Sequence, residues 1–372
     1  MTLDINQLIL NVMVFFMVLA SVDKCLGSRF GLGDQIQEAL GTIGPMCIPM
    51  VGMILLAPML GNFLLPVVTP FFRLLHADPA MFAGCILACD MGGYSLATAM
   101  ASSTEAANLS GCILGSSLGG VISFLMPVGI SMVRKEYRPY FATGVLIGVI
   151  TIPINLIVGG LAAGYALDMI FWNALPILLL SLFIAVSLWK AQKTTIRVFE
   201  IIGTLISCIA TVGFAIGIIQ ELTSLTVIPG LSSVLDGIKV VGSVAIVLCG
   251  AYPMLYLISK AANRPIQRVG RLLGVDDVAV SGILGGFANI MPVLNSCNRM
   301  SPAGVVVATA FAVSGTCTFG DHLGFVASVD RSMIVPMILS KLASCFVAIL
   351  IAAVLCRKKQ FSTVSVPAAS AA

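Results

Sequence analysis

Charged side chains are scarce in this sequence. Only 10% of its 372 residues are Asp, Glu, Lys or Arg, whereas 59% are apolar, and the mean hydropathy is +1.07. A soluble domain carries about 25% charged residues, which it needs to cover its surface. The composition therefore excludes a soluble enzyme. It also excludes an intrinsically disordered chain, which would need low hydrophobicity and high charge.

Sequence signatures of catalysis and metal binding are also missing. The chain has no Gly-x-x-x-x-Gly-Lys-Ser/Thr, His-Glu-x-x-His or Gly-x-Ser-x-Gly motif. Histidine occurs twice, and the 11 cysteines are odd in number and form no Cys-x-x-Cys pair. We therefore expect no enzyme activity, cofactor, metal or ATPase subunit, and we interpret the cysteines as packing residues. The net charge of +4 reflects loop topology, not nucleic-acid binding.

Long apolar runs are what the sequence has in abundance. Because about 20 apolar residues span a bilayer, the length suits about nine to eleven transmembrane segments. We predict an all-α polytopic membrane protein with one integral domain over 1–356, divided into repeat halves 1–190 and 191–356. A short cytoplasmic tail follows over 357–372. The runs lie near 3–22, 43–72, 80–100, 109–133, 139–165, 170–189, 198–220, 240–259, 278–297, 303–328 and 334–356.

Most of the 20 basic residues gather after the first, second, fourth, sixth, eighth and last runs, and the positive-inside rule places such clusters in the cytoplasm. This predicts a periplasmic N-terminus and a cytoplasmic C-terminus. Simple alternation cannot place every cluster on one side, so one segment in each half must return to its own side. The clusters are Lys24 with Arg29, Arg73, 134–138, 190–197, 260–271 and 357–359.

Two regions are candidates for the returning segments. Run 43–72 contains five prolines and suits a helical hairpin or a broken helix, which membranes tolerate only where protein or a cavity surrounds it. In the second half the candidates are 278–297 and 303–328. One irregular segment in each half is typical of a secondary transporter built from inverted repeats.

A short internal echo supports a repeat, although matches of this length also arise by chance. Residues 90–94 and 321–325 both read Asp-x-x-Gly-aromatic. Residues 57–60 likewise resemble 252–255, with Pro-Met-Leu in common.

Asp90 is the most informative residue, because a charge near the centre of an apolar run needs a reason. It suits an acceptor for a cationic group or a proton, and its structural alternative is a buried pair with Lys341. Gly92 and Gly93 would open the helix beside it. Tyr94, at i+4, would share its face and add a cation–π contact to an ammonium ion.

Asp321 and His322 repeat this pattern beside Phe325. We expect a second part of a substrate site here, or a proton-coupling site that includes Lys341. The alternative is that Lys341 simply holds Asp321, with His322 as a packing donor. Asn155 and Asn289 lie near Pro153 and Pro292. Their amides could bind a hydroxyl substrate or satisfy carbonyls freed by proline.

At these residues the sequence resembles the ethanolamine-utilisation transporters, the EutH family of ethanolamine permeases. The resemblance implies a multi-pass protein of the bacterial inner membrane that imports protonated ethanolamine for catabolism, with the lipid bilayer as its surroundings. The matching stretches are 50–53, 56–58, 82–93, 151–154, 250–254 and 320–325.

Other functions stay open at this stage. A secondary transporter of another small cationic or zwitterionic solute would use the same carboxylates. An intramembrane aspartyl protease with Asp90 and Asp321 as its dyad is a remote alternative, because Thr318-Phe319-Gly320 lacks the first glycine of the Gly-x-Gly-Asp pattern.

Overall fold

The structure, a computed structural model, describes residues 5–223 and 225–358, and within these ranges it contains helices and no strand. This confirms the predicted all-α polytopic membrane protein. Eight helical stretches are long and apolar enough to cross a membrane, by length and composition: Ile5–Cys25, Leu32–Leu74, Thr104–Met132, Arg138–Ala162, Leu167–Lys190, Gln192–Thr223, Val234–Arg271 and Arg331–Arg357.

The individual elements follow one another closely. The α-helices are α1 (Ile5–Cys25), α2 (Leu32–Gly41), α3 (Ile43–Met46), α4 (Gly52–Leu74), α5 (Met81–Ile86), α6 (Tyr94–Met100), α7 (Thr104–Asn108), α8 (Met126–Met132), α9 (Arg138–Ile150), α10 (Ile152–Ala162), α11 (Leu167–Lys190), α12 (Gln192–Thr223), α13 (Val234–Leu273), α14 (Asp277–Gly286), α15 (Met291–Ser296), α16 (Pro302–Gly315), α17 (Asp321–Val329) and α18 (Ile334–Lys358). Four π-helices, η1 (Cys47–Val51), η2 (Cys89–Gly93), η3 (Leu109–Gly119) and η4 (Val121–Leu125), and two 3₁₀ turns, η5 (Cys297–Arg299) and η6 (Arg331–Met333), join them.

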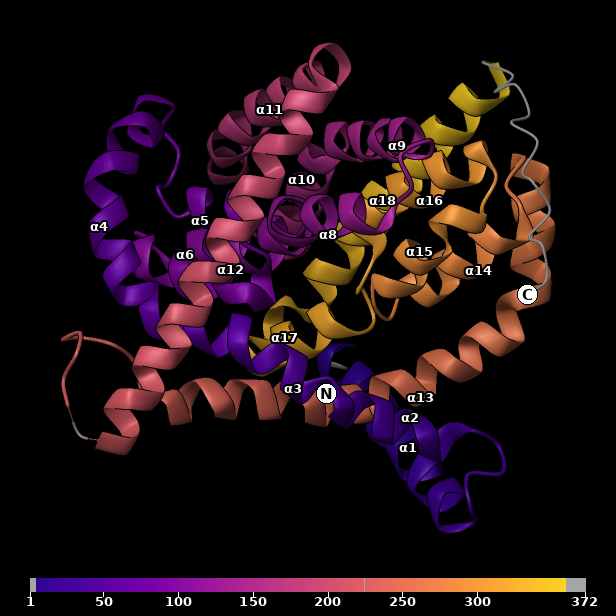
Figure 1. The fold of residues 1–372 in the computed structure, drawn as a ribbon, viewed down its shortest axis with the longest axis horizontal. Coiled ribbons are helices and arrows are strands. Elements are labelled where there is room, and N and C mark those ends of the chain that lie inside the picture. The colour runs from indigo at the N-terminus through magenta and orange to yellow at the C-terminus, as the bar shows by residue number, and fades with distance from the viewer. Residues whose placement is uncertain (1–4, 224, 359–372) are drawn as a thin grey trace.

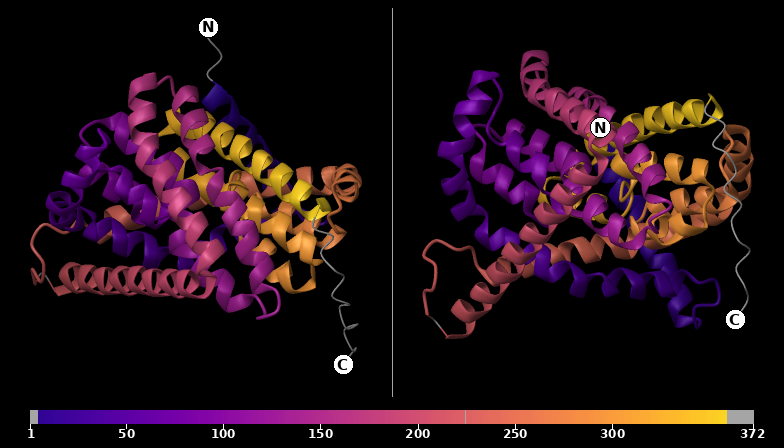
Figure 2. Two further views of the ribbon diagram at one scale, coloured as in Figure 1. Left: turned by 90° about the horizontal axis from the view of Figure 1, so that it is seen from above. Right: turned by 45° about the horizontal axis from the view of Figure 1, so that its top comes forward.

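Burial separates inner from outer helices. All eleven residues of η3 are buried, and so are Gly304–Gly315 of α16. In η3 small residues allow neighbouring segments of the chain to approach closely. By contrast α1 exposes large apolar side chains such as Phe15 and Val22, as a lipid-facing helix would. Figures 1 and 2 show the long helices α12 and α13 across the outside of the bundle, and α1 and α2 pack on α13.

Residues 78–102 form a re-entrant hairpin, here named hairpin 1. The chain enters through α5, turns through η2 and returns through α6. Asp78 Oδ2 accepts hydrogen bonds from the backbone N–H of Ser102, at 3.1 Å, and from its hydroxyl. The two ends of the hairpin therefore lie together. The chain continues into the first core segment, residues 104–132.

Residues 276–301 form a second re-entrant hairpin, hairpin 2, with the same closure. It consists of α14, a turn at 287–290, and α15 with η5. Asp276 Oδ2 accepts hydrogen bonds from the backbone N–H of Ser301, at 2.9 Å, and from its hydroxyl, at 2.6 Å. The chain then enters the second core segment, residues 302–329, which is broken at 316–320 between α16 and α17.

The two hairpins open at opposite ends of the bundle. Asn108, where the first core segment begins, donates a 2.8 Å hydrogen bond to Asp330, directly after the second segment ends. Asn298, directly before the second segment begins, donates a 2.9 Å bond to the carbonyl of Met132, where the first segment ends. The core segments are therefore antiparallel, and each hairpin precedes one of them.

The hairpin expected within 43–72 is not formed. Residues 52–74 are one helix, α4, which continues through Pro58, Pro66 and Pro70. A proline removes one helical hydrogen bond and bends the axis, but it does not reverse the chain. The reversal occurs in run 80–100 instead. In the second half, 278–297 forms the hairpin and 303–328 the broken helix. Of the expected tail over 357–372, residues 359–372 lie outside the described residues.

Candidate functional site

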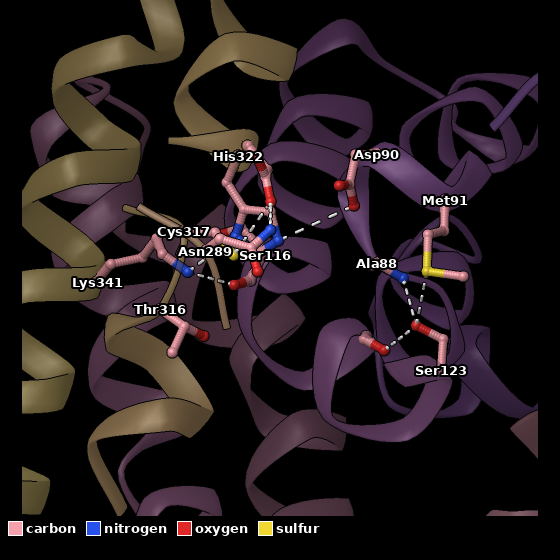
Figure 3. Close-up of polar contacts among 12 residues, drawn as sticks. Ala88, Asp90, Met91, Ser116, Ser123, Asn289, Thr316, Cys317, His322 and Lys341 are labelled. Carbon is pink, nitrogen blue, oxygen red and sulfur yellow. Dashed lines mark hydrogen bonds and ion pairs between the residues drawn. The ribbon is translucent and has the colours of Figure 1, made fainter. Parts of the chain in front are cut away.

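A cavity of about 630 Å³ lies where the turns of both hairpins meet both core segments. Asp90 and Met91 reach it from hairpin 1, and Asn289 from hairpin 2. The second core segment contributes Asp321 and His322 from the break between α16 and α17. The structure thus brings together four of the residues that the sequence singled out. Figure 3 shows Asp90 and His322 facing each other across this space.

Asp90 has fewer side-chain partners than Asp321. Its side chain is 16% exposed, and the His322 Nε2 atom lies 3.9 Å from its Oδ1 atom. No side chain of the described residues lies within hydrogen-bonding distance of its carboxylate oxygens. A buried carboxylate without a close cation is costly. The arrangement therefore leaves the Asp90 carboxylate able to accept a hydrogen bond from a cation in the cavity.

Lys341 sets the orientation of the His322 ring from the far side. The Lys341 Nζ atom is 3.1 Å from His322 Nδ1 and donates a 2.5 Å hydrogen bond to the Ser116 carbonyl (Figure 3). A charged Lys341 has no lone pair, so we assign Nδ1 as the acceptor and place the ring proton on Nε2. This N–H points toward Asp90. Lys341 is fully buried and reaches the site only through His322 and Ser116.

Asp321 has three fixed neutral partners. Tyr252 donates a 3.0 Å hydrogen bond to its Oδ1 atom, and Asn289 donates a 2.5 Å bond to Oδ2. The Cys317 thiol lies 3.9 Å from the same oxygen. The other end of the Asn289 amide accepts from the backbone N–H of Met291 at 2.9 Å. Both ends of the Asn289 amide are therefore engaged, one in holding Asp321 and the other in shaping the hairpin turn.

Backbone contacts lock hairpin 2 onto the break of the second core segment. The N–H groups of Cys317, Phe319 and Asp321 donate to the carbonyls of Gly286, Phe287 and Ala288, at 2.9, 3.0 and 3.3 Å. A Cβ atom at Gly320 would lie 1.9 Å from the Ala288 carbonyl oxygen, so only glycine permits this approach. The first core segment meets hairpin 1 in the same way, with Gly119 against the Leu87 carbonyl.

The turn of hairpin 1 depends on Gly92. Its φ angle is 88°, in the left-handed region, and a Cβ atom there would lie 2.3 Å from the Met53 Cβ atom. Gly93 closes the turn, because its N–H donates to the Ala88 carbonyl at 2.9 Å. The glycines therefore reverse the chain beside Asp90.

Tyr94 does not share the cavity with Asp90. The backbone is not helical at Met91 and Gly92, so the i+4 spacing that the sequence suggested does not hold. The Tyr94 and Phe325 rings instead pack edge to face, with centroids 6.1 Å apart, and both line a separate cavity of about 480 Å³. The two aromatic residues of the echo thus meet each other away from the carboxylates.

Asn155 lies outside the cavity wall. It is fully buried on α10, where its Oδ1 atom accepts from Ser117 at 3.1 Å and its Nδ2 atom donates to Ser340 at 3.2 Å. Both ends of the amide are used, so Asn155 joins the first core segment to α18.

Cys89, Asp90 and His322 place one donor atom each within 4.8 Å of one another. This spacing alone would suit a transition-metal ion. A metal requires the lone pair of His322 Nε2, however, and Lys341 at Nδ1 keeps the proton there. The trio therefore suits a hydrogen-bond network better than a metal centre.

Four residues of the site were missed in the sequence. Phe124 provides the aromatic ring of the main cavity, Ser116 binds Lys341, and Tyr252 binds Asp321. Glu38, an exposed carboxylate on α2, lines both the main cavity and an adjoining one of about 530 Å³. Tyr252 precedes the Pro-Met-Leu of the echo, which was a usable signal. The others carry no local pattern.

Comparison with known families gives a match over nearly the whole chain. Residues 5–355 match the family model described as "Ethanolamine utilisation protein, EutH". No solved structure matches the chain.

Individual relatives are similar over most of their length. A "Probable ethanolamine permease EutH" of Listeria monocytogenes is 44% identical over 91% of both chains. An uncharacterised protein of Bacillus subtilis is 40% identical over 92% of both chains. A "Probable ethanolamine permease EutH" of Salmonella typhimurium is 37% identical over 98% of this chain and 99% of its own.

Proposed function

Because the chain belongs to the EutH family of ethanolamine utilisation proteins, we propose that it is a permease that carries protonated ethanolamine across the bacterial cytoplasmic membrane. Transport would be inward and would supply ethanolamine catabolism. The proposal concerns transport and not catalysis. The partners it requires are the small solute and the lipid bilayer.

One observation carries the proposal: besides the exposed Glu38, the main cavity is lined by the carboxylates Asp90 and Asp321, but no lysine or arginine of the described residues lines it, and Lys341 lies behind His322. Protonated ethanolamine would supply the missing positive charge at Asp90 through a charge-assisted hydrogen bond. Phe124 offers a ring face to the ammonium group. The hydroxyl end of the solute would lie toward Asp321, in a cavity large enough for a small amino alcohol.

The arrangement of the hairpins supports an alternating-access transporter. Two re-entrant hairpins that open at opposite ends, each followed by a long core segment, form the pattern of an inverted repeat. We propose that α4, hairpin 1 and the first core segment correspond to α13, hairpin 2 and the second. The units would fall within the halves 1–190 and 191–356.

The same arrangement suggests an orientation. The end where hairpin 2 opens carries Arg134 and Lys135, so it would face the cytoplasm. The N-terminus would be periplasmic, because Asn6 accepts a 3.0 Å hydrogen bond from Val335, close to Asp330 at the opposite end. The C-terminus would be cytoplasmic. Arg73 closely precedes Asp78, where hairpin 1 opens, so it would lie on the periplasmic side. It would be an exception to the cytoplasmic location of the basic clusters.

The alternative functions use the same residues differently. Another small cation would need the same acceptor, and competition by choline, serinol and amino acids separates it from ethanolamine. An aspartyl protease needs two carboxylates that share a proton. Here His322 faces Asp90, and Asp321 is engaged by Tyr252 and Asn289, so the geometry favours transport.

Uptake of [¹⁴C]ethanolamine into proteoliposomes tests the proposal. The wild type should show saturable uptake, which Asp90→Asn should lose while inserting normally. Asp277→Asn, at an exposed position of α14, is the matched control and should behave as the wild type. Wild-type uptake no faster than that of empty liposomes would refute an ethanolamine permease. Undiminished uptake by Asp90→Asn would refute the assigned site.

A pH gradient added to the same assay tests energy coupling. Asp321, His322 and Lys341 are the groups proposed to couple transport to protons. Uptake that a gradient accelerates in the wild type, but not in Asp321→Asn, would assign coupling to Asp321. Uptake that ignores the gradient would establish facilitated diffusion of the cation.

A further inference from the structure

Lys341 is buried at the candidate site but does not neutralise either carboxylate by direct contact. It is fully buried, and no ion pair within 4.0 Å joins it to Asp90 or Asp321. Its ammonium group is held by the Ser116 carbonyl and by His322 Nδ1. A lysine so placed is a fixed positive charge behind the site, and the solute does not need to displace it.

With both carboxylates ionised and Lys341 protonated, the charges of the site add up to one negative charge. Asp90 and Asp321 contribute two negative charges, Lys341 contributes one positive charge, and His322 with a single ring proton is neutral. Glu38 at the rim is exposed and solvated, so it does not change this balance. One monovalent cation therefore neutralises the buried groups, whereas a divalent cation leaves an uncompensated positive charge in a low-dielectric site.

From this balance we infer that Lys341 is a specificity-determining residue, which restricts the site to solutes with one positive charge and rejects diamines of similar size. The inference rests on the proposed function, since it names the charge class of the solute for the same cavity. Lys341 acts without touching the solute: it sets the net charge and fixes the proton of His322 on Nε2.

The inference predicts that selectivity reverses when the charge of Lys341 is removed. In Lys341→Gln the site would carry two negative charges. It should then favour 1,3-diaminopropane, a dication at neutral pH, over ethanolamine. Lys341→Arg keeps the charge and should retain the wild-type order.

A double variant separates charge from structure. Lys341→Gln combined with Asp321→Asn returns the net charge to one negative charge and removes the excess buried carboxylate. It should regain the preference for ethanolamine. A purely structural role for Lys341 predicts no such recovery, because the second substitution restores none of the contacts that Lys341 makes. This variant also keeps the test possible if Lys341→Gln alone fails to fold.

The experiment measures uptake of labelled ethanolamine and of labelled 1,3-diaminopropane into proteoliposomes. The wild type should prefer ethanolamine by roughly 100-fold, the ratio that an uncompensated buried charge implies, and Lys341→Gln should invert the order. Lys239→Gln, at an exposed lysine on α13, is the matched control. Folded Lys341→Gln that keeps the wild-type order, or a double variant that fails to recover it, would overturn the inference. A wild type that transports neither solute would instead refute the proposed function.

Discussion

Asp78 and Ser102 close one re-entrant hairpin, and Asp276 and Ser301 close the other with the same donors and the same carboxylate oxygen. In each pair, Oδ2 of the aspartate accepts from the backbone N–H and from the hydroxyl of the serine. The Oδ1 atom of each aspartate also accepts a hydrogen bond from a backbone N–H near the start of its hairpin. The donor is Ala80 for Asp78 and Ala279 for Asp276. These closures fix how far each hairpin turn reaches into the helical bundle, and so they hold Asp90 and Asn289 in the cavity.

Replacement of Asp276 by alanine should therefore loosen hairpin 2. The variant loses the N-cap of α14 and both bonds to Ser301, which together correspond to about 2–4 kcal/mol of stability. Thermal unfolding of the purified protein in detergent measures this. Asp277→Ala removes the neighbouring exposed carboxylate and should stay within about 0.5 kcal/mol of the wild type. Equal midpoints for the two variants would contradict the role of the closure.

Replacement of Gly92 by alanine should be among the most damaging small changes. The left-handed conformation and the approach of Met53 together imply a loss of about 2–5 kcal/mol. Substitutions at two other glycines separate the effect of backbone strain from the effect of the contact with Met53. Gly230 has a φ of 83° but open space around it, so Gly230→Ala should show strain alone, about 1–2 kcal/mol.

Gly44 completes this series. It lies in α3, with a helical backbone, and nothing lies within 4 Å of the position that an alanine Cβ atom would take, so Gly44→Ala should be neutral or slightly stabilising. The order of unfolding midpoints, from highest to lowest, should be Gly44→Ala, then Gly230→Ala, then Gly92→Ala. If Gly92→Ala unfolds no earlier than Gly230→Ala, the contact with Met53 has no energetic weight.

Replacement of Tyr252 by phenylalanine should destabilise the protein, because Asp321 loses a hydrogen-bond donor. The variant loses a hydrogen bond to a buried carboxylate, which corresponds to about 1.5–3 kcal/mol. Because the hydroxyl group of bound ethanolamine would donate to Asp321 in place of Tyr252, ethanolamine should raise the unfolding midpoint more in Tyr252→Phe than in the wild type. Tyr256→Phe, one turn further along α13, should leave the ethanolamine-dependent shift unchanged. Equal shifts in all three proteins would argue that the solute does not bind near Asp321.

How far the sequence predicts this molecule depends on the kind of signal. Composition alone gives the fold class, because few charges cannot cover a soluble surface. The position of the re-entrant segment in the first half was not predictable from proline. Pro58, Pro66 and Pro70 stay within one helix, whereas the chain reverses at Gly92, where the sequence predicted an opened helix but no reversal.

The echo within the sequence was only partly informative. Pro58 and Pro253 lie on α4 and α13, the helices that would correspond in the proposed repeat. Asp90 and Asp321, however, occupy different positions: the turn of hairpin 1 and the start of α17. In the proposed repeat, the residue that matches Asp90 by position would be Asn289. Such a correspondence depends on which segments reverse, and that is decided by tertiary contacts such as the one between Asp276 and Ser301.

The contact between Tyr94 and Phe325 gives a last prediction, about access to the cavity. Both rings line the cavity of about 480 Å³ and neither lines the main cavity, so we expect the ring pair to act as a barrier between the two. An edge-to-face pair contributes about 0.5–1.5 kcal/mol, so Tyr94→Ala should shift the equilibrium toward a state open on that side by about 2- to 13-fold.

The small cationic reagent 2-aminoethyl methanethiosulfonate measures this opening, because Cys317 lines the main cavity and its modification should block uptake. Applied from outside to intact cells, it should inactivate Tyr94→Ala about 2- to 13-fold faster than the wild type. Tyr94→Phe keeps the ring pair and should react at the wild-type rate. Cys317→Ser should abolish the inactivation in every background. An unchanged rate in Tyr94→Ala would mean that the two rings do not limit access, and that the solute enters the cavity by another route.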